Sequence, residues 1–309
     1  MSDLKVCITI DTDADPLIKN HKTSVSFKNL DYSLNKISDK FTELENKLNI
    51  TLPISWFVRV DNQIKDELGS YDWILNNYSK FWENERSKKN EIHWHSHIYE
   101  MINDKWVFPK NKSFYLNEIE KIFNFLKKNH FEPECIRMGE AYMNNDIMNL
   151  LKNLGLKADS SCIPGRQRKD KEKFFDWSTA KNFPYFPSNK NYQEEDKIKK
   201  NFLEIPMNTI QTKCEYDKKP LLRYMNLAFK SHITYNGLEK FIKDNDLLVT
   251  ISHPYEFFDK FENNKVLLSN DLNTLEENIN NIFKLSKQFK KNIRFVKISE
   301  IINDYLNEK

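Results

Sequence analysis

Glycine is scarce in this chain of 309 residues, which contains 5 glycines and 4 cysteines. Loops that bind nucleotide phosphates need several glycines at fixed spacing directly after a strand. The sequence holds no such run, so it predicts neither a P-loop nor a dinucleotide-binding fingerprint. The cysteines form no Cys-x-x-Cys pair, and Cys7 and Cys135 lie in apolar stretches. We therefore expect reduced, buried thiols at these two positions.

Long apolar runs are also missing, since no segment reaches the roughly 18 residues at which a membrane-spanning helix becomes a candidate. The first residues, MSDLKVCITID, begin a strand rather than a charged leader with an apolar segment, and we expect a cytoplasmic protein. Net charge is only +3, with 48 basic and 45 acidic residues interspersed. A nucleic-acid partner is not expected, because it requires a segregated basic face. Oligomeric state is left open.

Short apolar runs alternate with helical patterns along the whole chain, which predicts an α/β fold with a parallel sheet. Because no phosphate-binding loop follows any strand, a (β/α) barrel is favoured over a doubly wound sheet. We expect one barrel domain over residues 1–309, with a long irregular excursion at about 162–200 that covers the mouth of the site. Gly155 is expected to end a helix and Ser299 to cap the last one. The expected strands are Leu4–Ile10, Ile54–Val60, Glu91–Ser96, Cys135–Met138, Lys157–Ser161, Phe202–Pro206, Leu247–Ser252 and Ile293–Ile298.

Polar residues cluster where these strands end. The carboxyl ends of barrel strands meet on one face, where active sites are built. Two carboxylates, histidines from two strands and an arginine at such ends predict a hydrolytic metal site. The strand-end residues are Asp11, Asp13, His95, His97, Arg137, Asp159, Ser160 and His253.

Three histidines stand at alternate positions in the segment EIHWHSHIYE, residues 91–100. Alternate side chains of an extended strand share one face, so His93, His95 and His97 can point the same way. Imidazole is a common metal ligand, and His-x-His presents two of them in a short space. A histidine-rich strand edge without a metal is the alternative.

Five segments resemble the motifs of the polysaccharide deacetylases, the NodB-homology carbohydrate esterases. In order they are ITIDTDAD, EIHWHSHIYE, CIRMGEAYMNNDIMNLLKNLGLKADSS, FLEIPM and LLVTISHPYEF, and they span roughly residues 4–258. The resemblance implies a distorted (β/α)₇ barrel. It also implies a hydrolase that uses a divalent metal, zinc above all, to remove N- or O-acetyl groups from sugars.

By the same resemblance, Asp11 is the catalytic base, Asp13 a metal ligand, Arg137 the residue that orients the base and His253 the general acid. Thr12 separates two aspartates that usually adjoin in the family.

The family's metal histidines stand four residues apart. In that register His95 is the first ligand and Tyr99 occupies the second position, a departure from the pattern. Alternatively, His93 and His97 supply the spacing of four. We expect His95 with His97.

The expected substrate is an acetylated free sugar, nucleotide sugar or lipid-linked glycan, in surface-polysaccharide biosynthesis. Several aromatic residues are candidates to stack on a sugar ring. A catalytically degenerate sugar-binding protein on the same barrel is one alternative. Another is a haloacid-dehalogenase-type phosphatase that uses Asp11 as nucleophile with magnesium, although Asp15 stands where its motif wants Thr or Val. The aromatic candidates are Trp94, Tyr99, Tyr142, Trp177 and Tyr255.

Overall fold

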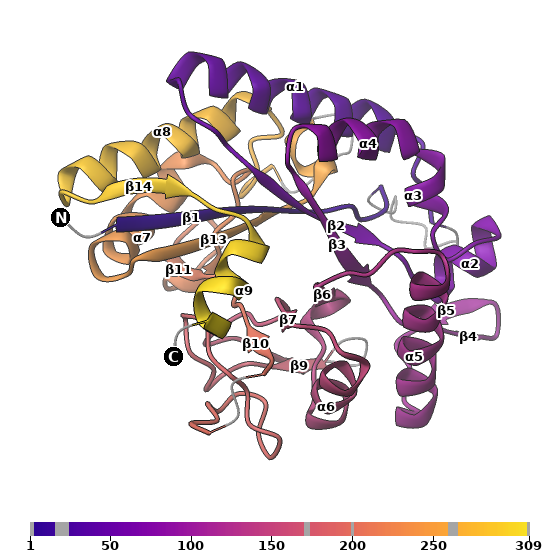
Figure 1. Ribbon diagram of the computed structural model, residues 1–309. Coiled ribbons are helices and arrows are strands. Elements are labelled where there is room, and N and C mark those ends of the chain that lie inside the picture. Colours follow the sequence, from indigo (N-terminus) through magenta and orange to yellow (C-terminus); the bar gives the residue numbers. More distant parts are fainter. Residues whose placement is uncertain (1–2, 16–24, 170–173, 199–200, 259–264, 308–309) are drawn as a thin grey trace.

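A curled sheet of eight parallel strands forms the centre of the molecule (Figure 1). The computed structural model describes residues 3–15, 25–169, 174–198, 201–258 and 265–307. The strand order is β10-β7-β6-β3-β2-β1-β13, and β14 also pairs with β1. The predicted parallel α/β architecture is therefore confirmed. The strands are β1 (Asp3–Asp11), β2 (Ile54–Arg59), β3 (Glu91–Ser96), β6 (Cys135–Met138), β7 (Ala158–Asp159), β10 (Leu203–Glu204), β13 (Leu247–Ser252) and β14 (Asn292–Phe295).

Helices connect the strands, and three short hairpins extend from them. Gly155 ends α6 in the left-handed conformation, with φ of 90°, as predicted. The helices are α1 (Leu30–Leu48), α2 (Asn62–Leu68), α3 (Trp73–Asn77), α4 (Ser79–Ser87), α5 (Lys112–Lys128), α6 (Asn145–Leu154), α7 (Ser231–Asp244), α8 (Asn273–Gln288) and α9 (Ile298–Asn307), with 3₁₀ turns η1 (Gly139–Ala141) and η2 (Pro254–Phe257). The hairpins are β4–β5 (Glu100–Ile102, Lys105–Val107), β8–β9 (Gln167–Lys169, Phe174–Asp176) and β11–β12 (Thr209–Thr212, Leu221–Tyr224).

The two faces of the sheet follow from the alternation of side chains along each strand. The even-numbered residues of β1, from Leu4 to Ile10, pack in one apolar cluster with α1 and α8. Cys7 belongs to the opposite face, where Ile298, Ile301 and Ile302 of α9 join residues of six strands. Helix α9 therefore packs on the concave face of the sheet near the start of β1 (Figure 1).

The sheet does not close into a regular barrel. Among the described residues no strand pairing joins β10 to β13. The irregular chain after β10 bridges them: Asn208 N–H donates to the Val249 carbonyl at 3.2 Å, and Val249 N–H donates to Asn208 Oδ1 at 2.6 Å. Ile251 N–H donates to the Met225 carbonyl at 2.9 Å. The architecture is consistent with a distorted barrel, while the (β/α)₇ type itself stays a prediction.

Strands β7 and β10 are shorter than expected, and two details of the path at the end of the chain were wrong. Strand β14 ends at Phe295, and α9 already begins at Ile298, so the last strand is shorter than Ile293–Ile298. Ser299 lies inside α9 rather than capping it, and both its N–H and its hydroxyl donate to Glu91. The half-buried Glu91 carboxylate thus accepts from the Ser299 groups that we had expected to form a local cap.

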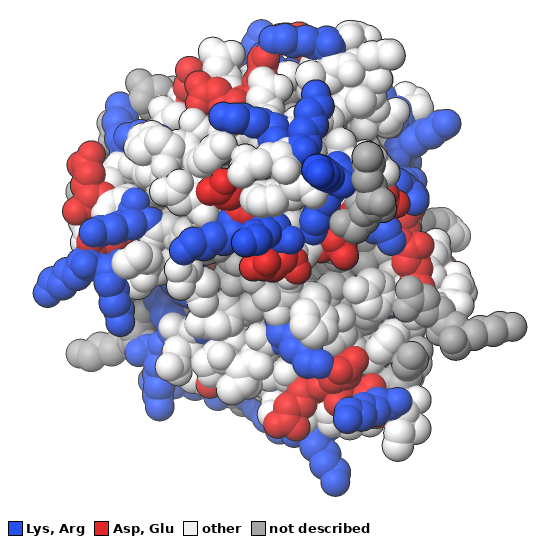
Figure 2. Space-filling model, turned by 90° about the vertical axis from the view of Figure 1, so that its left-hand side faces the viewer, with Lys and Arg blue, Asp and Glu red and all other residues white. Residues whose placement is uncertain are grey.

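Surface charge is mixed on the face at the left of Figure 1, which Figure 2 shows. Basic and acidic side chains are interspersed there rather than segregated. All four cysteines are buried and unpaired, as expected for Cys7 and Cys135. Within the described residues, no helix has the length and apolar character needed to cross a membrane.

Candidate active site

Strand register brings the predicted site residues onto one face of the sheet. His95 on β3 lies directly between Arg59 on β2 and Arg137 on β6. Adjacent residues of parallel strands share a face, so all three side chains lie on the concave side. Asp11 ends β1, and His253 directly follows β13, the neighbour of β1. The strand-end positions chosen from the sequence therefore do meet.

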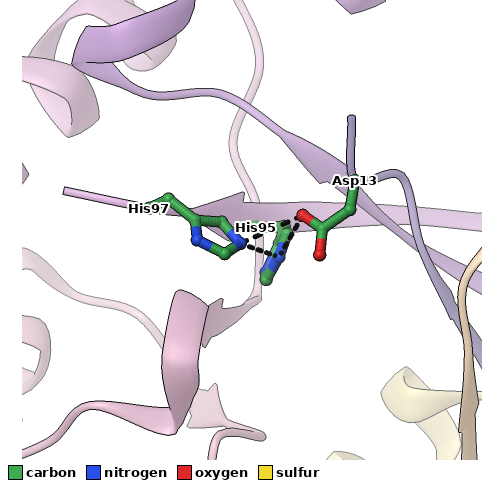
Figure 3. Close-up of side chains that lie close together, drawn as sticks. All are labelled: Asp13, His95 and His97. Atoms are coloured by element: carbon green, nitrogen blue, oxygen red, sulfur yellow. Dashed lines mark hydrogen bonds and ion pairs between the residues drawn. The ribbon is translucent and has the colours of Figure 1, made fainter. Parts of the chain in front are cut away.

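Asp13, His95 and His97 converge on one point (Figure 3). Asp13 Oδ1 lies 3.2 Å from His95 Nε2 and 3.0 Å from His97 Nε2, and the two Nε2 atoms are 2.9 Å apart. Both histidines are buried, and Asp13 is partly buried. Burial alone raises the pKa of Asp13, but the two histidines bring it well below its usual value. Burial alone lowers the pKa of His95, but the carboxylates of Asp11 and Asp13 raise it above its usual value.

The hydrogen-bond partner of Nδ1 identifies the tautomer of each of the two imidazole rings. The Arg137 carbonyl oxygen, which can only accept, lies 2.9 Å from His95 Nδ1, so that nitrogen carries the proton. The Tyr99 hydroxyl donates to Glu140 Oε1 at 3.1 Å and accepts from His97 Nδ1 at 3.2 Å. In neutral rings both Nε2 atoms then present lone pairs beside a carboxylate oxygen. Three electron-pair donors converge with no hydrogen between them, an arrangement that fits a cation.

The first turn of α2 holds the segment that follows β3. Asp61 caps α2 by accepting from Ile64 N–H at 3.0 Å, and its other oxygen accepts from His97 N–H at 3.3 Å. Asn62 exchanges two hydrogen bonds with the backbone of Tyr99, at 3.2 and 2.5 Å. We had not predicted either residue. Asp61 follows a strand end, the same signal that identified the others.

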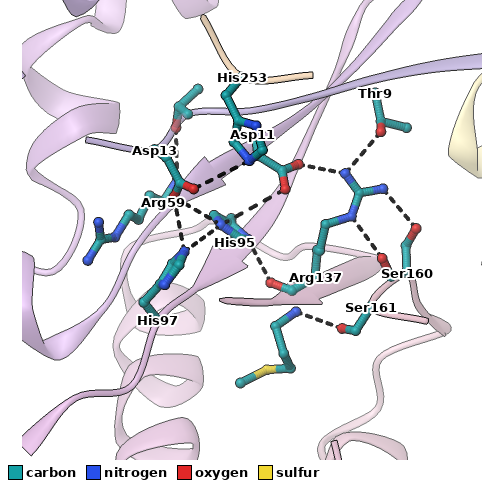
Figure 4. A network of polar contacts seen from close by, with 12 residues as sticks. Thr9, Asp11, Asp13, Arg59, His95, His97, Arg137, Ser160, Ser161 and His253 are labelled. Carbon is teal, nitrogen blue, oxygen red and sulfur yellow. Dashed lines mark hydrogen bonds and ion pairs between the residues drawn. The ribbon is translucent and has the colours of Figure 1, made fainter. Parts of the chain in front are cut away.

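Asp11 is fixed by Arg137 at the inner wall of the site (Figure 4). Arg137 Nη1 donates to Asp11 Oδ1 at 2.6 Å and to Thr9 Oγ1 at 2.9 Å. Its Nε and Nη2 donate to the carbonyl and hydroxyl of Ser160, at 2.8 and 2.9 Å. The second carboxylate oxygen of Asp11 lies 4.0 Å from His95 Nε2 and so faces the cluster of Asp13, His95 and His97. Two charged groups, 2% and 1% exposed, thus neutralise one another without blocking that oxygen.

His253 stands on the opposite side of Asp13 from the two other histidines. Its Nε2 lies 3.5 Å from Asp13 Oδ2, and its Nδ1 lies 3.2 Å from Glu256 Oε2. Glu256 Oε2 accepts from the His253 backbone N–H and from Asn226 Nδ2, each at 2.7 Å. Burial lowers the pKa of His253, but Glu256, Asp13 and Asp11 raise it overall to about 10. We had not predicted Glu256, although it lies only three residues after His253.

His93 does not reach this point. It lies deeper, where its Nε2 is 3.1 Å from Glu91 Oε2 and its ring packs on Phe57 at 5.3 Å between centroids. Of the alternative ligand pairs left open by the sequence, the arrangement therefore favours His95 with His97. Tyr99 contacts His97 from behind rather than joining the cluster.

The remaining candidates take supporting places. Asp159 accepts from the N–H and hydroxyl of Ser161, at 3.1 and 2.6 Å, below the site. Trp94 and Trp177 are fully buried, which excludes them from stacking on a sugar. Trp177 Nε1 donates to the Ala141 carbonyl at 2.8 Å and so ties the 162–200 excursion to the turn beside Tyr99 and Glu140. Whether that excursion covers the mouth stays a prediction.

Comparison with known proteins identifies similar folds but no similar sequence. No family profile and no curated protein matches the sequence. A candidate polysaccharide deacetylase from Mycobacterium smegmatis aligns with a TM-score of 0.56 at 13% identity, over 98% of this chain and 90% of that one. A candidate polysaccharide deacetylase involved in O-antigen biosynthesis from Bordetella bronchiseptica aligns with a TM-score of 0.39 at 8% identity, over 97% and 90%. A 4-alpha-glucanotransferase from Thermococcus litoralis aligns at 0.45 and 15% identity, over 98% and 38%. At the level of the fold, the first of these matches supports the resemblance to polysaccharide deacetylases that the motifs suggested.

Proposed function

We propose that this chain is a metal-dependent deacetylase that hydrolyses an N- or O-acetyl group on a sugar. The observation that carries the proposal is the convergence of Asp13 Oδ1 with the Nε2 atoms of His95 and His97, all within 3.2 Å of one another. Two imidazoles and one carboxylate are a common ligand set of catalytic zinc sites, which keep a further position open. The fold match and the motifs support the choice of reaction.

Asp13, His95 and His97 would hold the cation. When bound, a divalent cation such as zinc polarises an acyl carbonyl and lowers the pKa of water from 15.7 toward about 7. The Asp11 carboxylate, anchored by Arg137 at 2.6 Å, has its second oxygen free to accept a proton from the attacking water. The ion pair with Arg137 fixes the position of the Asp11 carboxylate beside the proposed cation site.

His253 serves as the general acid. The Glu256 carboxylate, 3.2 Å from Nδ1, favours the protonated form of the ring, so Nε2 can donate. Water adds to the acyl carbon, Asp11 takes its proton, and the bond to the sugar nitrogen or oxygen breaks. His253 delivers a proton to that leaving atom, which releases acetate and the free amine or hydroxyl. Asp11 Oδ2 lies 4.0 Å from His95 Nε2, and His253 Nε2 lies 3.5 Å from Asp13 Oδ2, so both proton-transfer groups border the proposed cation site.

The substrate we propose is an acetylated sugar, nucleotide sugar or lipid-linked glycan of surface-polysaccharide biosynthesis. The test is acetate release from a panel of N- and O-acetylated sugars and sugar nucleotides. The protein is first stripped with a chelator and then supplied with zinc or cobalt.

We expect activity to follow reloading and to be lost in His95→Ala and His97→Ala. His232→Ala, at an exposed position on α7, is the matched control. Metal binding without turnover on any substrate would favour a sugar-binding protein. A covalent phosphoryl adduct on Asp11 would favour the phosphatase alternative, and either result would overturn the proposal.

A further inference from the structure

The ring of His97 is held from behind by two residues that take no part in the chemistry described above. Tyr99 stacks on it, with ring centroids 5.7 Å apart and planes 23° apart. The Tyr99 hydroxyl lies 3.2 Å from His97 Nδ1 and donates to Glu140 Oε1 at 3.1 Å. A chain of hydrogen bonds therefore runs from the ring through a phenol to a carboxylate.

The turn that carries Glu140 has an unusual backbone. Glu140 and Ala141 adopt consecutive left-handed conformations, with φ of 57° and 53°. This conformation is unfavourable for any residue other than glycine. Residues in this region persist only where surrounding contacts determine them, and they gather at functional sites. Here the indole of Trp177 holds the Ala141 carbonyl at 2.8 Å.

The residue before Glu140 leaves room for the ring. A Cβ on Gly139 would lie 2.4 Å from His97 Cγ, far inside van der Waals contact. The turn thus supplies both the space that His97 occupies and the carboxylate that holds Tyr99. The strained backbone of Glu140 and Ala141 is therefore found at a turn that fixes the imidazole of His97.

We propose that Tyr99 and Glu140 are positioning residues that fix the tautomer and orientation of His97, so that its Nε2 stays directed at the cation site. This inference rests on the proposed function, in which His97 holds a divalent cation. Partners of this kind orient a metal-binding histidine, and their loss typically lowers metal affinity by about 10–100-fold. Tyr99 thereby has a role at the position where the sequence motif departs from the resembled family.

The test compares Tyr99→Phe and Glu140→Gln with the unaltered chain. Phenylalanine keeps the stacked ring and removes only the hydroxyl. Zinc affinity, measured by competition with a chromophoric chelator, should fall about 10–100-fold in Tyr99→Phe. The visible spectrum of bound cobalt should shift, while the melting temperature of the chelated protein should not. Tyr115→Phe, at a buried tyrosine whose ring packs on Phe108 and Tyr142, is the control and should bind zinc normally.

Nitrogen NMR of the chelated protein gives a readout that does not depend on metal. In the unaltered chain His97 should carry its proton on Nδ1, and in Tyr99→Phe that preference should be lost. If both chains show the same tautomer and the same zinc affinity, the positioning role is wrong. If Tyr99→Phe lowers the melting temperature of the chelated protein as well as its zinc affinity, Tyr99 has a merely structural role. That result would also overturn the positioning role. If the unaltered chain binds no zinc, the proposed function is refuted. If the tautomer of His97 nevertheless differs between the unaltered chain and Tyr99→Phe, the positioning role of Tyr99 still holds.

Discussion

Replacing Glu91 by glutamine should destabilise the fold in a way that depends on pH. The Glu91 side chain is 15% exposed and accepts from Ser299 N–H at 3.1 Å and from its hydroxyl. Lys297 Nζ lies 3.3 Å away, and His93 Nε2 3.1 Å away. Burial raises the pKa of Glu91, but His93 and Ser299 lower it overall to about 2, from a usual 4.5. At about 1.4 kcal/mol per pKa unit, the ionised carboxylate contributes about 3 kcal/mol.

The sign follows from the direction of this change. A carboxyl group whose pKa is lowered by folding stabilises the folded chain fully above its unfolded pKa of about 4.5. The contribution declines as pH falls from there and vanishes below about 2. Glu91→Gln should therefore lose about 3 kcal/mol of unfolding free energy at pH 7, and the two chains should become nearly equal toward pH 2.

Urea unfolding of chelated protein, followed by tryptophan fluorescence between pH 7 and pH 3, measures this difference. Glu83→Gln, an exposed glutamate on α4, is the matched control and should change little. Hydrogen exchange at Ile301 and Ile302 should also quicken in Glu91→Gln, because Glu91 holds the first turn of α9. A difference that stays constant across the pH range, or no difference at pH 7, would refute the reasoning.

Three further substitutions test the site. Asp11→Asn should keep zinc stoichiometry and lose turnover by roughly 10²–10⁴-fold, whereas Asp39→Asn on the exposed face of α1 should lose none. His253→Gln should also keep zinc, and its turnover should fall more on amides than on aryl esters, whose leaving group needs no proton; equal losses would contradict a general acid. Gly139→Ala should weaken zinc binding, measured by chelator competition, because the added methyl displaces the His97 ring; unchanged affinity would show that the ring has room.

Much of the sheet was predictable because its strands are short, apolar and bounded by polar residues. The expected bounds of Glu91–Ser96, Cys135–Met138 and Leu247–Ser252 are those observed. Parallel pairing then brings the residues after these strands to one end of the sheet, whatever the connections between them. That rule placed Asp11, Arg137 and His253 together without knowledge of any contact.

Contacts that close the sheet and dock the last helix were not predictable. Asn208 fills the gap between β10 and β13 with its side chain as well as its backbone, which no local pattern indicates. Ser299 reads as a helix cap in isolation, yet its donors go to Glu91, more than 200 residues away in the chain. Hydrogen bonds between distant segments override the local preference in both cases.

Which of the three alternating histidines face Asp13 depends on where β3 ends. Had β3 continued past Ser96, alternation would have kept His93, His95 and His97 on one face at successive depths. Instead Asp61 takes the N–H of His97, and Asn62 takes the backbone of Tyr99, so the chain turns over the end of the sheet. The turn carries His97 Nε2 back to 2.9 Å from His95 Nε2 and leaves His93 below, paired with a carboxylate. Side-chain contacts from Asp61 and Asn62, at the start of α2, therefore determine which two imidazoles face Asp13, and the segment EIHWHSHIYE alone does not reveal them.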